Sequence, residues 1–510
     1  MKGTSSQTTD GARPPGNGHE QDLAGVARGG SLNLAGQGLS QILRFVMTLV
    51  LARLLDVANV GLYSQAFAFL AVLALLSLSG FQSALTRFVA VHRADNRPEF
   101  LRGTVQLGLA LPTAAAVVLG CVLFALSGWL SESVFHDPRL LTPFRFVALA
   151  LPATVFTDAA LAATRGFKSM RAYALISLIF EPTSRLALTW ILVAAGFGIT
   201  GAMVALVVTS VAAAALAARA LWRLMGPSTS PPRYIWRRLF AFSSASWAAT
   251  VASTGLLWAD TMLLGIYGTA SDVGLYQVAT RLTLFAMIFM HAINASFAPR
   301  IADLYRSDRR EDLAALYKVV TSLIVRLSLP VFMLLLVFPR ELLAIFGPAY
   351  EIGAAVTMLL AIGTLSDVLS GPCGHMLMMS GRPYLAMANN ILALTLNIGL
   401  NVWLIPRYGI VGAGVAWAAS LVFINLSRVT QVYVVMKMVP FDRGLTKGVV
   451  AAAAALPGAL LVEANMGGLA ALLVGAIAIV FVYVGTIFSL GLEAQDRLVW
   501  SSLRRRARTN

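Results

Sequence analysis

The sequence predicts an all-α, multi-pass membrane protein, in which about fourteen transmembrane helices form two similar six-helix lobes and a C-terminal pair. Three observations support this fold class. Apolar stretches of about 20 residues, the length that crosses a bilayer, recur between residues 31 and 491. Cationic residues cluster in every second connection between these stretches, and two short motifs occur twice in the same order.

The composition excludes an ordinary soluble protein. Of the 510 residues, 58% are hydrophobic and only 12% are charged, whereas soluble proteins are roughly a quarter charged. The net charge of +16 does not indicate a nucleic-acid-binding protein, because most basic residues lie in short connections between apolar stretches. Cys121 and Cys373 lie inside apolar stretches and have no metal-ligand spacing.

The apolar stretches give the predicted transmembrane spans. They are residues 31–54, 61–88, 104–127, 143–163, 173–196, 200–221, 240–266, 273–297, 315–338, 353–378, 384–405, 410–435, 446–463 and 468–491.

The connections between the spans alternate in charge. Arg and Lys gather at 93–102, 165–171, 223–238, 306–310 and 437–447, and Arg382 continues this series, whereas the intervening connections are short and nearly neutral. The positive-inside rule therefore places the cationic connections and both termini in the cytoplasm, including the basic run 504–508.

The repeated motifs divide the chain into two halves of the same orientation. Val60–Tyr63 recurs as Val273–Tyr276, and Gly198–Ala205 recurs in similar form as Gly409–Ala416. An even number of spans in each unit makes the repeat parallel. The predicted organisation is a disordered cytoplasmic tail (1–28), an N-lobe (29–226), a C-lobe (227–438) and an accessory pair with a basic tail (439–510).

Two arginines lie deep inside predicted spans. Arg44 shares a helical face with Gln37 and Gln41, and Arg281 shares one with Gln277. Ionisable groups inside a membrane are costly and usually functional. We therefore expect both arginines to face a central cavity. The alternative is that carbonyls or a carboxylate cap them for packing.

Other polar side chains inside the spans have two interpretations each. Glu181 and Arg185, at i and i+4, either line the cavity or neutralise each other. Asparagines at 397 and 401 either hydrogen-bond a sugar or hold helices together. The remaining candidates either take part in binding a coupling Na⁺ or H⁺ or have a structural role through an ion pair or hydrogen bond: Asp158, Asp260, Asp367 and His291.

Enzymatic function is not indicated. The sequence has no phosphate-binding Gly-x-x-x-x-Gly-Lys-Ser/Thr run, no metal-ligand cluster and no hydrolase-like Gly-x-Ser-x-Gly. The connections between spans are too short for a soluble catalytic domain. We therefore expect no catalytic residues and no cofactor other than a coupling ion.

Three stretches resemble a known family. They are Leu51–Leu55 followed by Val60–Tyr63, Asp260–Gly265 leading into Val273–Tyr276, and Asn401–Ala413. In these residues the chain is similar to bacterial polysaccharide transporters and O-antigen flippases. This family belongs to the multidrug/oligosaccharidyl-lipid/polysaccharide exporter superfamily, and the resemblance runs from about residue 31 to residue 491.

The resemblance implies two lobes around a V-shaped cavity, working by alternating access. It implies a polyprenyl-pyrophosphate-linked oligosaccharide, a surface polysaccharide or O-antigen repeat unit, moved from the inner to the outer leaflet of the bacterial cytoplasmic membrane. The pyrophosphate suits the buried arginines, and the Asn and Gln stripes suit the sugar. The implied partners are membrane lipids and the glycosyltransferases and polymerase of the same pathway, with the transporter itself a monomer.

Three other functions remain as alternatives. A lipid II flippase would carry a denser set of cavity arginines and acids near the start of the chain. A drug/cation antiporter would need an acidic cavity in which Asp158, Asp260 and Asp367 converge. A membrane polysaccharide polymerase or ligase would want a large outer loop, and the outer connections here are short.

Overall fold

The computed structural model describes residues 18–227 and 230–491, and every regular element in this part of the chain is helical. The first lobe is built from residues before position 228. Its elements are α1 (Gly18–Leu54), α2 (Val57–Leu78), α3 (Phe81–Ala94), α4 (Pro98–Trp129), η1 (Leu130–Val134), η2 (Pro138–Leu140), α5 (Leu141–Gly166), α6 (Met170–Tyr173), η3 (Ala174–Phe180), α7 (Glu181–Leu192), η4 (Val193–Phe197) and α8 (Gly198–Met225).

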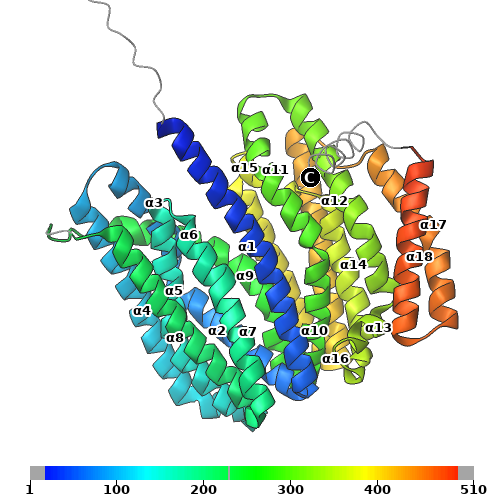
Figure 1. Cartoon of the computed structure of the whole chain (residues 1–510), viewed down its shortest axis with the longest axis horizontal. Coiled ribbons are helices and arrows are strands. Elements are labelled where there is room, and N and C mark those ends of the chain that lie inside the picture. Colours follow the sequence, from blue (N-terminus) through cyan, green and yellow to red (C-terminus); the bar gives the residue numbers. More distant parts are fainter. Residues whose placement is uncertain (1–17, 228–229, 492–510) are drawn as a thin grey trace, which may run out of the picture.

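The second lobe and the C-terminal pair follow. Their elements are α9 (Trp236–Tyr267), α10 (Ala270–Ala286), α11 (Ile288–Arg306), α12 (Arg310–Val337), α13 (Pro339–Ala344), η5 (Pro348–Gly353), α14 (Ala354–Ser370), α15 (Cys373–Met379), α16 (Pro383–Met436), α17 (Arg443–Asn465) and α18 (Gly468–Ser489). In Figure 1 the two groups of helices lie on either side of α1.

Most predicted spans coincide with helices, but three are divided between two helices: 61–88 at residues 79–80, 273–297 at residue 287, and 353–378 at residues 371–372. In the described residues, nine helices are long and apolar enough to cross a membrane, or ten if the bent pair α10–α11 is one span. Two of the nine, Met170–Met225 and Tyr384–Met436, each contain two predicted spans. The number of spans therefore stays a prediction, whereas the polytopic all-α fold is confirmed.

The tail predicted at 1–28 differs in its last part. Helix α1 begins at Gly18, so the residues from there to 28 are helical. The remainder of that tail, and the basic run at 504–508, lie outside the described residues.

The second repeated motif forms the same sharp reversal in both lobes. Gly198 has φ 52° and ψ −141°, and Gly409 has φ 55° and ψ −134°. This region of φ and ψ is accessible almost only to glycine. Each glycine ends one helix and begins the next, so the repeated sequence encodes a repeated turn.

The first repeated motif also has the same register in both lobes. Asp56 caps α2 by accepting a hydrogen bond from the Asn59 amide at 3.0 Å, and Thr269 forms a capping box with Asp272 at the start of α10. A cap fixes where a helix begins. The Val-Gly-Leu-Tyr motif therefore occupies the same turn of α2 and of α10.

The two copies of this motif meet where the lobes join. A Cβ atom on Gly61 would lie 1.7 Å from the Ala270 carbonyl oxygen, and one on Gly274 would lie 2.1 Å from the Val57 carbonyl oxygen. Only glycine allows backbones to approach this closely. The N-terminal ends of α2 and α10 are therefore packed backbone to backbone, and the lobes are closed against each other here.

Helix α1 joins the lobes at the same end. The Arg53 side chain donates through Nε to the Ile345 carbonyl oxygen at 2.8 Å, which links the end of α1 to the segment after α13. Phe45 packs edge-on against Phe346, with ring centroids 5.5 Å apart. These contacts tie the first helix of the N-lobe to the C-lobe.

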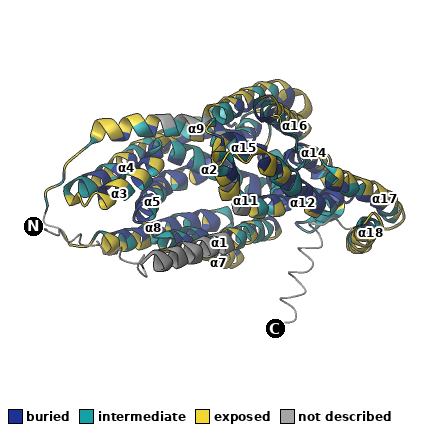
Figure 2. Ribbon diagram, turned by 90° about the horizontal axis from the view of Figure 1, so that it is seen from above, coloured by how far each residue is buried: buried dark blue, intermediate teal, exposed yellow. Residues whose placement is uncertain are grey.

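The C-terminal pair stands at one edge of the molecule. Helices α17 and α18 pack against each other and against α12, and Figure 2 shows them at the outer side of the C-lobe. Alanines such as Ala451 and Ala455 make the buried seam, while Phe481 is 80% exposed. The two additional C-terminal helices are therefore peripheral, and their role as an accessory pair stays a prediction.

Candidate functional site: a cationic cavity between the lobes

A cavity of about 660 Å³ lies between the lobes. Its walls come from α1, α2, η3 and α7 of the N-lobe and from α9, α10, α11, α14 and α16 of the C-lobe. This volume is in the range of small-molecule binding sites, about 300–1,000 Å³. The cavity contains groups that lie far apart in the sequence and meet only in the fold.

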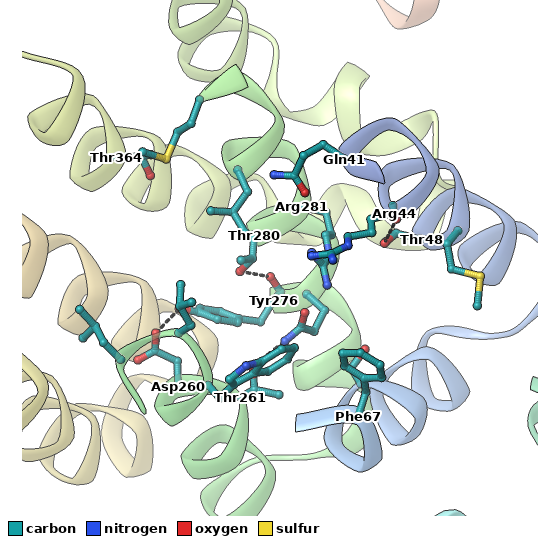
Figure 3. Close-up of a pocket in the computed structure, with 18 of the residues that line it drawn as sticks. Gln41, Arg44, Thr48, Phe67, Asp260, Thr261, Tyr276, Thr280, Arg281 and Thr364 are labelled. Atoms are coloured by element: carbon teal, nitrogen blue, oxygen red, sulfur yellow. Dashed lines mark hydrogen bonds between the residues drawn. The ribbon is translucent and has the colours of Figure 1, made fainter. Parts of the chain in front are cut away.

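The structure places Arg44 and Arg281 in this one cavity. Figure 3 shows their side chains pointing into the same space from α1 and α10. Within the described residues neither guanidinium forms an ion pair. Two positive charges therefore face the cavity without a bound carboxylate partner. Such charges in the membrane interior are costly, which favours a site for an anion.

A third arginine in the cavity is already neutralised. Arg185 Nη2 lies 2.5 Å from Glu181 Oε1, one turn away on α7. The Arg185 guanidinium also stacks 5.6 Å from the Phe67 ring. Both members of the pair line the cavity, so the two interpretations of this stripe are realised together.

The three predicted glutamines have different positions. Gln41 and Gln277 line the cavity, and Gln277 Nε2 donates to Thr261 Oγ1 at 2.5 Å. Gln37 is exposed and does not line it. Because Gln37 lies one turn before Gln41 on α1, the shared helical face continues past the end of the cavity.

Of the two interpretations of Asn397 and Asn401, the structure supports helix packing, because neither residue lines the cavity. Both are fully buried, and both donate through Nδ2 to Asp260 Oδ1, at 2.9 Å and 2.5 Å. Tyr276 Oη donates to Asp260 Oδ2 at 2.8 Å, as Figure 3 shows for this pair. A buried carboxylate needs such donors, so the asparagines hold helix α16 against α9. Asp260 itself reaches the cavity wall.

The other candidate coupling-ion residues are divided between two cavities. Asp367 and His291 line the main cavity. Asp158 lines a smaller cavity of about 260 Å³, which also borders Glu181 and Arg185. The three acids of the antiporter alternative therefore do not converge.

Two polar residues of the cavity were not among the predicted site residues. Arg428 and Asn390 line the cavity together with Asp367. The spacing of Asn425 and Arg428 on one helix face was a signal, but it does not tell which helix lies opposite. Their partners come from α14 and from the other half of α16.

Comparisons with known proteins point to one family. The family model described as "polysaccharide biosynthesis protein" matches residues 26–305, and the MatE model matches residues 247–403. The solved structure of the lipid II flippase MurJ in an inward closed conformation is similar with a TM-score of 0.71, at 13% identity, covering 93% of this chain and 99% of that one. An inward-facing multidrug resistance MATE transporter has a TM-score of 0.59, at 14% identity, covering 82% and 96%.

Curated relatives include two flippases from Haloferax volcanii. The probable low-salt glycan biosynthesis flippase Agl15 is 30% identical over 203 residues, which is 39% of this chain and 43% of the relative. The probable flippase AglR is 27% identical over 198 residues, 38% and 41% of the two chains. These matches thus span less than half the length of either relative.

The comparisons confirm the resemblance drawn from the sequence. The named relatives are flippases and transporters rather than enzymes, in agreement with the prediction. The likeness to MurJ and MATE transporters establishes the two-lobed fold. Because its family model matches more than half of the sequence, this multi-pass membrane protein belongs to the polysaccharide biosynthesis protein family.

Proposed function

We propose that the protein is a flippase that moves a polyprenyl-pyrophosphate-linked oligosaccharide from the inner to the outer leaflet. The observation that carries this proposal is the pair of unpaired guanidiniums, Arg44 and Arg281, in one cavity between the lobes. A pyrophosphate has several negative charges and many acceptor oxygens. Arginine is suited to such a group because its planar fork makes charge-assisted, often bidentate hydrogen bonds.

The cavity charge also argues against the drug/cation antiporter. Four arginines and three carboxylates line the cavity. Glu181 is bound to Arg185 and Asp367 lies 3.8 Å from Arg428, so Arg44 and Arg281 remain without an ion pair against the single carboxylate of Asp260. A cationic drug would meet net repulsion at the Arg44 end. An anionic head group would relieve the cost of keeping these charges in the membrane.

Alternating access is the proposed mechanism. The lobes are closed where α2 and α10 begin, and Arg53 links α1 to the C-lobe at the same end. The positive-inside rule assigns this end to the outer face. Transport would then separate Gly61 from Gly274 and close the lobes at the cytoplasmic end. The polyprenyl tail stays in lipid while the head group crosses.

We also propose the cytoplasmic membrane as the location, with both termini in the cytoplasm. The cationic connections support this orientation. The glycosyltransferases and the polymerase of the same glycan pathway are the proposed partners, since one must supply the lipid-linked unit and the other must consume it.

Asp260 is the proposed site for a coupling Na⁺ or H⁺. It is a 2% exposed carboxylate at the cavity wall, and no described cation pairs with it. The Asn401 Oδ1 atom beside it is buried without a hydrogen-bond partner. Carboxylate and amide oxygens are ligands that hard cations prefer.

The test is complementation of a deletion strain, followed by reconstitution. Arg44→Ala and Arg281→Ala should each reduce flipping of a fluorescent lipid-linked oligosaccharide in proteoliposomes by at least about tenfold, since hydrogen bonds to charged groups are worth about 1.5–3 kcal/mol. The matched control is Arg407→Ala. Arg407 is exposed and its Nη1 bonds only the Trp403 carbonyl oxygen, outside the cavity. Wild-type flipping rates in both cavity variants would contradict the proposal.

A further inference from the structure

The cavity has a second polar end, in the C-lobe, whose chemistry differs from that of the arginine end. Asp367 comes from α14, and Asn390 and Arg428 come from the two halves of α16. We infer that this group is the glycan-binding subsite, which recognises the hydroxyl groups of the first sugars attached to the pyrophosphate. The inference rests on the proposed function and adds the part of the site that recognises the glycan.

The charges of the two ends support a division of labour. Arg428 Nη1 lies 3.8 Å from Asp367 Oδ1, so the C-lobe end is close to neutral. The Arg44 and Arg281 end has two unpaired positive charges. A lipid-linked sugar would place its anionic pyrophosphate at the cationic end and its uncharged, hydroxyl-rich sugar at the nearly neutral end.

The hydrogen-bonding groups at the C-lobe end suit hydroxyls. Asn390 Oδ1 accepts from Arg428 Nη2 at 2.9 Å, which fixes the amide plane and turns its Nδ2 donors away from the arginine. Within the described residues, Asn390 Nδ2 donates to nothing. A hydroxyl both donates and accepts, so a pre-oriented amide beside a carboxylate and a guanidinium offers it partners for both roles.

The cavity also has an apolar wall that fits a sugar ring. Trp417 and Leu421, from α16, line the same cavity. An indole offers a broad, rigid face against which the C–H face of a pyranose packs. The hairpin at Gly409 brings Asn390 and Arg428 together, although they lie on opposite halves of α16.

A cation at Asp367 is the competing occupant, and the geometry argues against it. The Arg428 guanidinium already neutralises this carboxylate and would repel a second cation. Within the described residues, no group of three or more His, Cys, Asp or Glu side chains has metal-binding geometry.

The test compares two probes on the purified full chain in lipid nanodiscs. The first is farnesyl pyrophosphate, and the second is farnesyl pyrophosphate that carries a disaccharide, taken from a panel of hexose and N-acetylhexosamine heads. The wild type should bind at least one glycosylated probe more tightly than the bare one. Asn390→Ala should lower that preference by about threefold to tenfold and leave the Kd of the bare probe unchanged.

The matched control is Asn389→Ala. Asn389 is the preceding residue on the same helix, but it exchanges two hydrogen bonds with Gln431 away from the cavity, so the preference should stay at the wild-type value. Arg44→Ala should weaken both probes by the same factor. If Asn390→Ala does not fold, Asn390→Ser and Asp367→Asn answer the same question with smaller changes in shape.

The outcomes separate the two proposals. A wild-type protein with no preference for any glycosylated head, or an Asn390→Ala variant that keeps the preference, would overturn the subsite. So would an Asp367→Asn variant whose only defect is altered Na⁺ or pH dependence. If bare farnesyl pyrophosphate does not bind, or Arg44→Ala leaves its Kd unchanged, the pyrophosphate site itself fails.

Discussion

The contact between Gly61 and Gly274 gives the sharpest structural prediction. A Cβ atom on Gly61 would lie 1.7 Å from a backbone oxygen of α10, and contacts under 3.0 Å are essentially never seen for real Cβ atoms. The obstructing atom cannot rotate away, because it belongs to the main chain. Gly61→Ala therefore requires α2 and α10 to separate by more than an ångström.

The cost follows from the packing around this contact. Val60 and Leu62 are each 1% exposed, so a separation disturbs a dense interface. Overpacking of this kind costs about 1–3 kcal/mol. For domains of 150–250 residues, each kcal/mol lowers Tm by about 2–4 °C. We expect Gly61→Ala and Gly274→Ala each to melt several degrees below the wild type. The loss of stability in the double variant should be smaller than the sum of the two single losses, because one separation of α2 and α10 relieves both clashes.

The assay is thermal unfolding of the purified protein in detergent, followed by intrinsic fluorescence. Gly399→Ala is the control, because Gly399 lies in α16 and a Cβ there meets nothing within 4 Å. Its Tm should stay level or rise slightly, since alanine favours helix by about 1 kcal/mol. A Gly61→Ala variant that melts with the wild type, or fully additive losses in the double variant, would refute the reasoning.

Three further predictions use other residues. Gly409→Ala should lower Tm through backbone strain of about 1–3 kcal/mol, although the space around it is open; an unchanged Tm would mean that the turn relaxes. Glu181→Gln should strengthen binding of farnesyl pyrophosphate and steepen its salt dependence, because it releases the charge of Arg185; weaker binding would place that charge outside the cavity. Asp260→Ala should cost at least about 2 kcal/mol in unfolding experiments, because it removes the acceptor of three buried donors, and Asp260→Asn should cost less.

The sequence was sufficient for the helices and for the duplication. Bilayer-length apolar stretches are a local property, and most of them coincide with helices, whereas the breaks at 79–80, 287 and 371–372 were not predicted. The repeats also predicted equivalent local structures. Residues 198 and 409 adopt nearly the same φ and ψ, because glycine is needed wherever the chain reverses this way.

The site could be predicted only in part. An arginine deep inside an apolar span can be recognised in the sequence. Placing its charge in the membrane costs free energy, so such a residue usually has a function. Arg44 and Arg281 were found in this way, and the fold brings them to one cavity. Their convergence depends on the packing of two lobes, which no local pattern encodes.

The roles of the asparagines were decided by tertiary structure alone. Helical spacing puts Asn397 and Asn401 on one face of α16, but it does not say what lies opposite. The opposing group is Asp260, which lies 137 residues before Asn397 and 141 residues before Asn401. Both amides therefore donate their hydrogen bonds to a buried carboxylate. Asn390, on the same helix, meets the cavity instead. The sequence by itself determined which side chains are polar inside the membrane. The tertiary structure determined which of them have protein partners and which remain to bind a ligand, because that depends on the group across the helix interface.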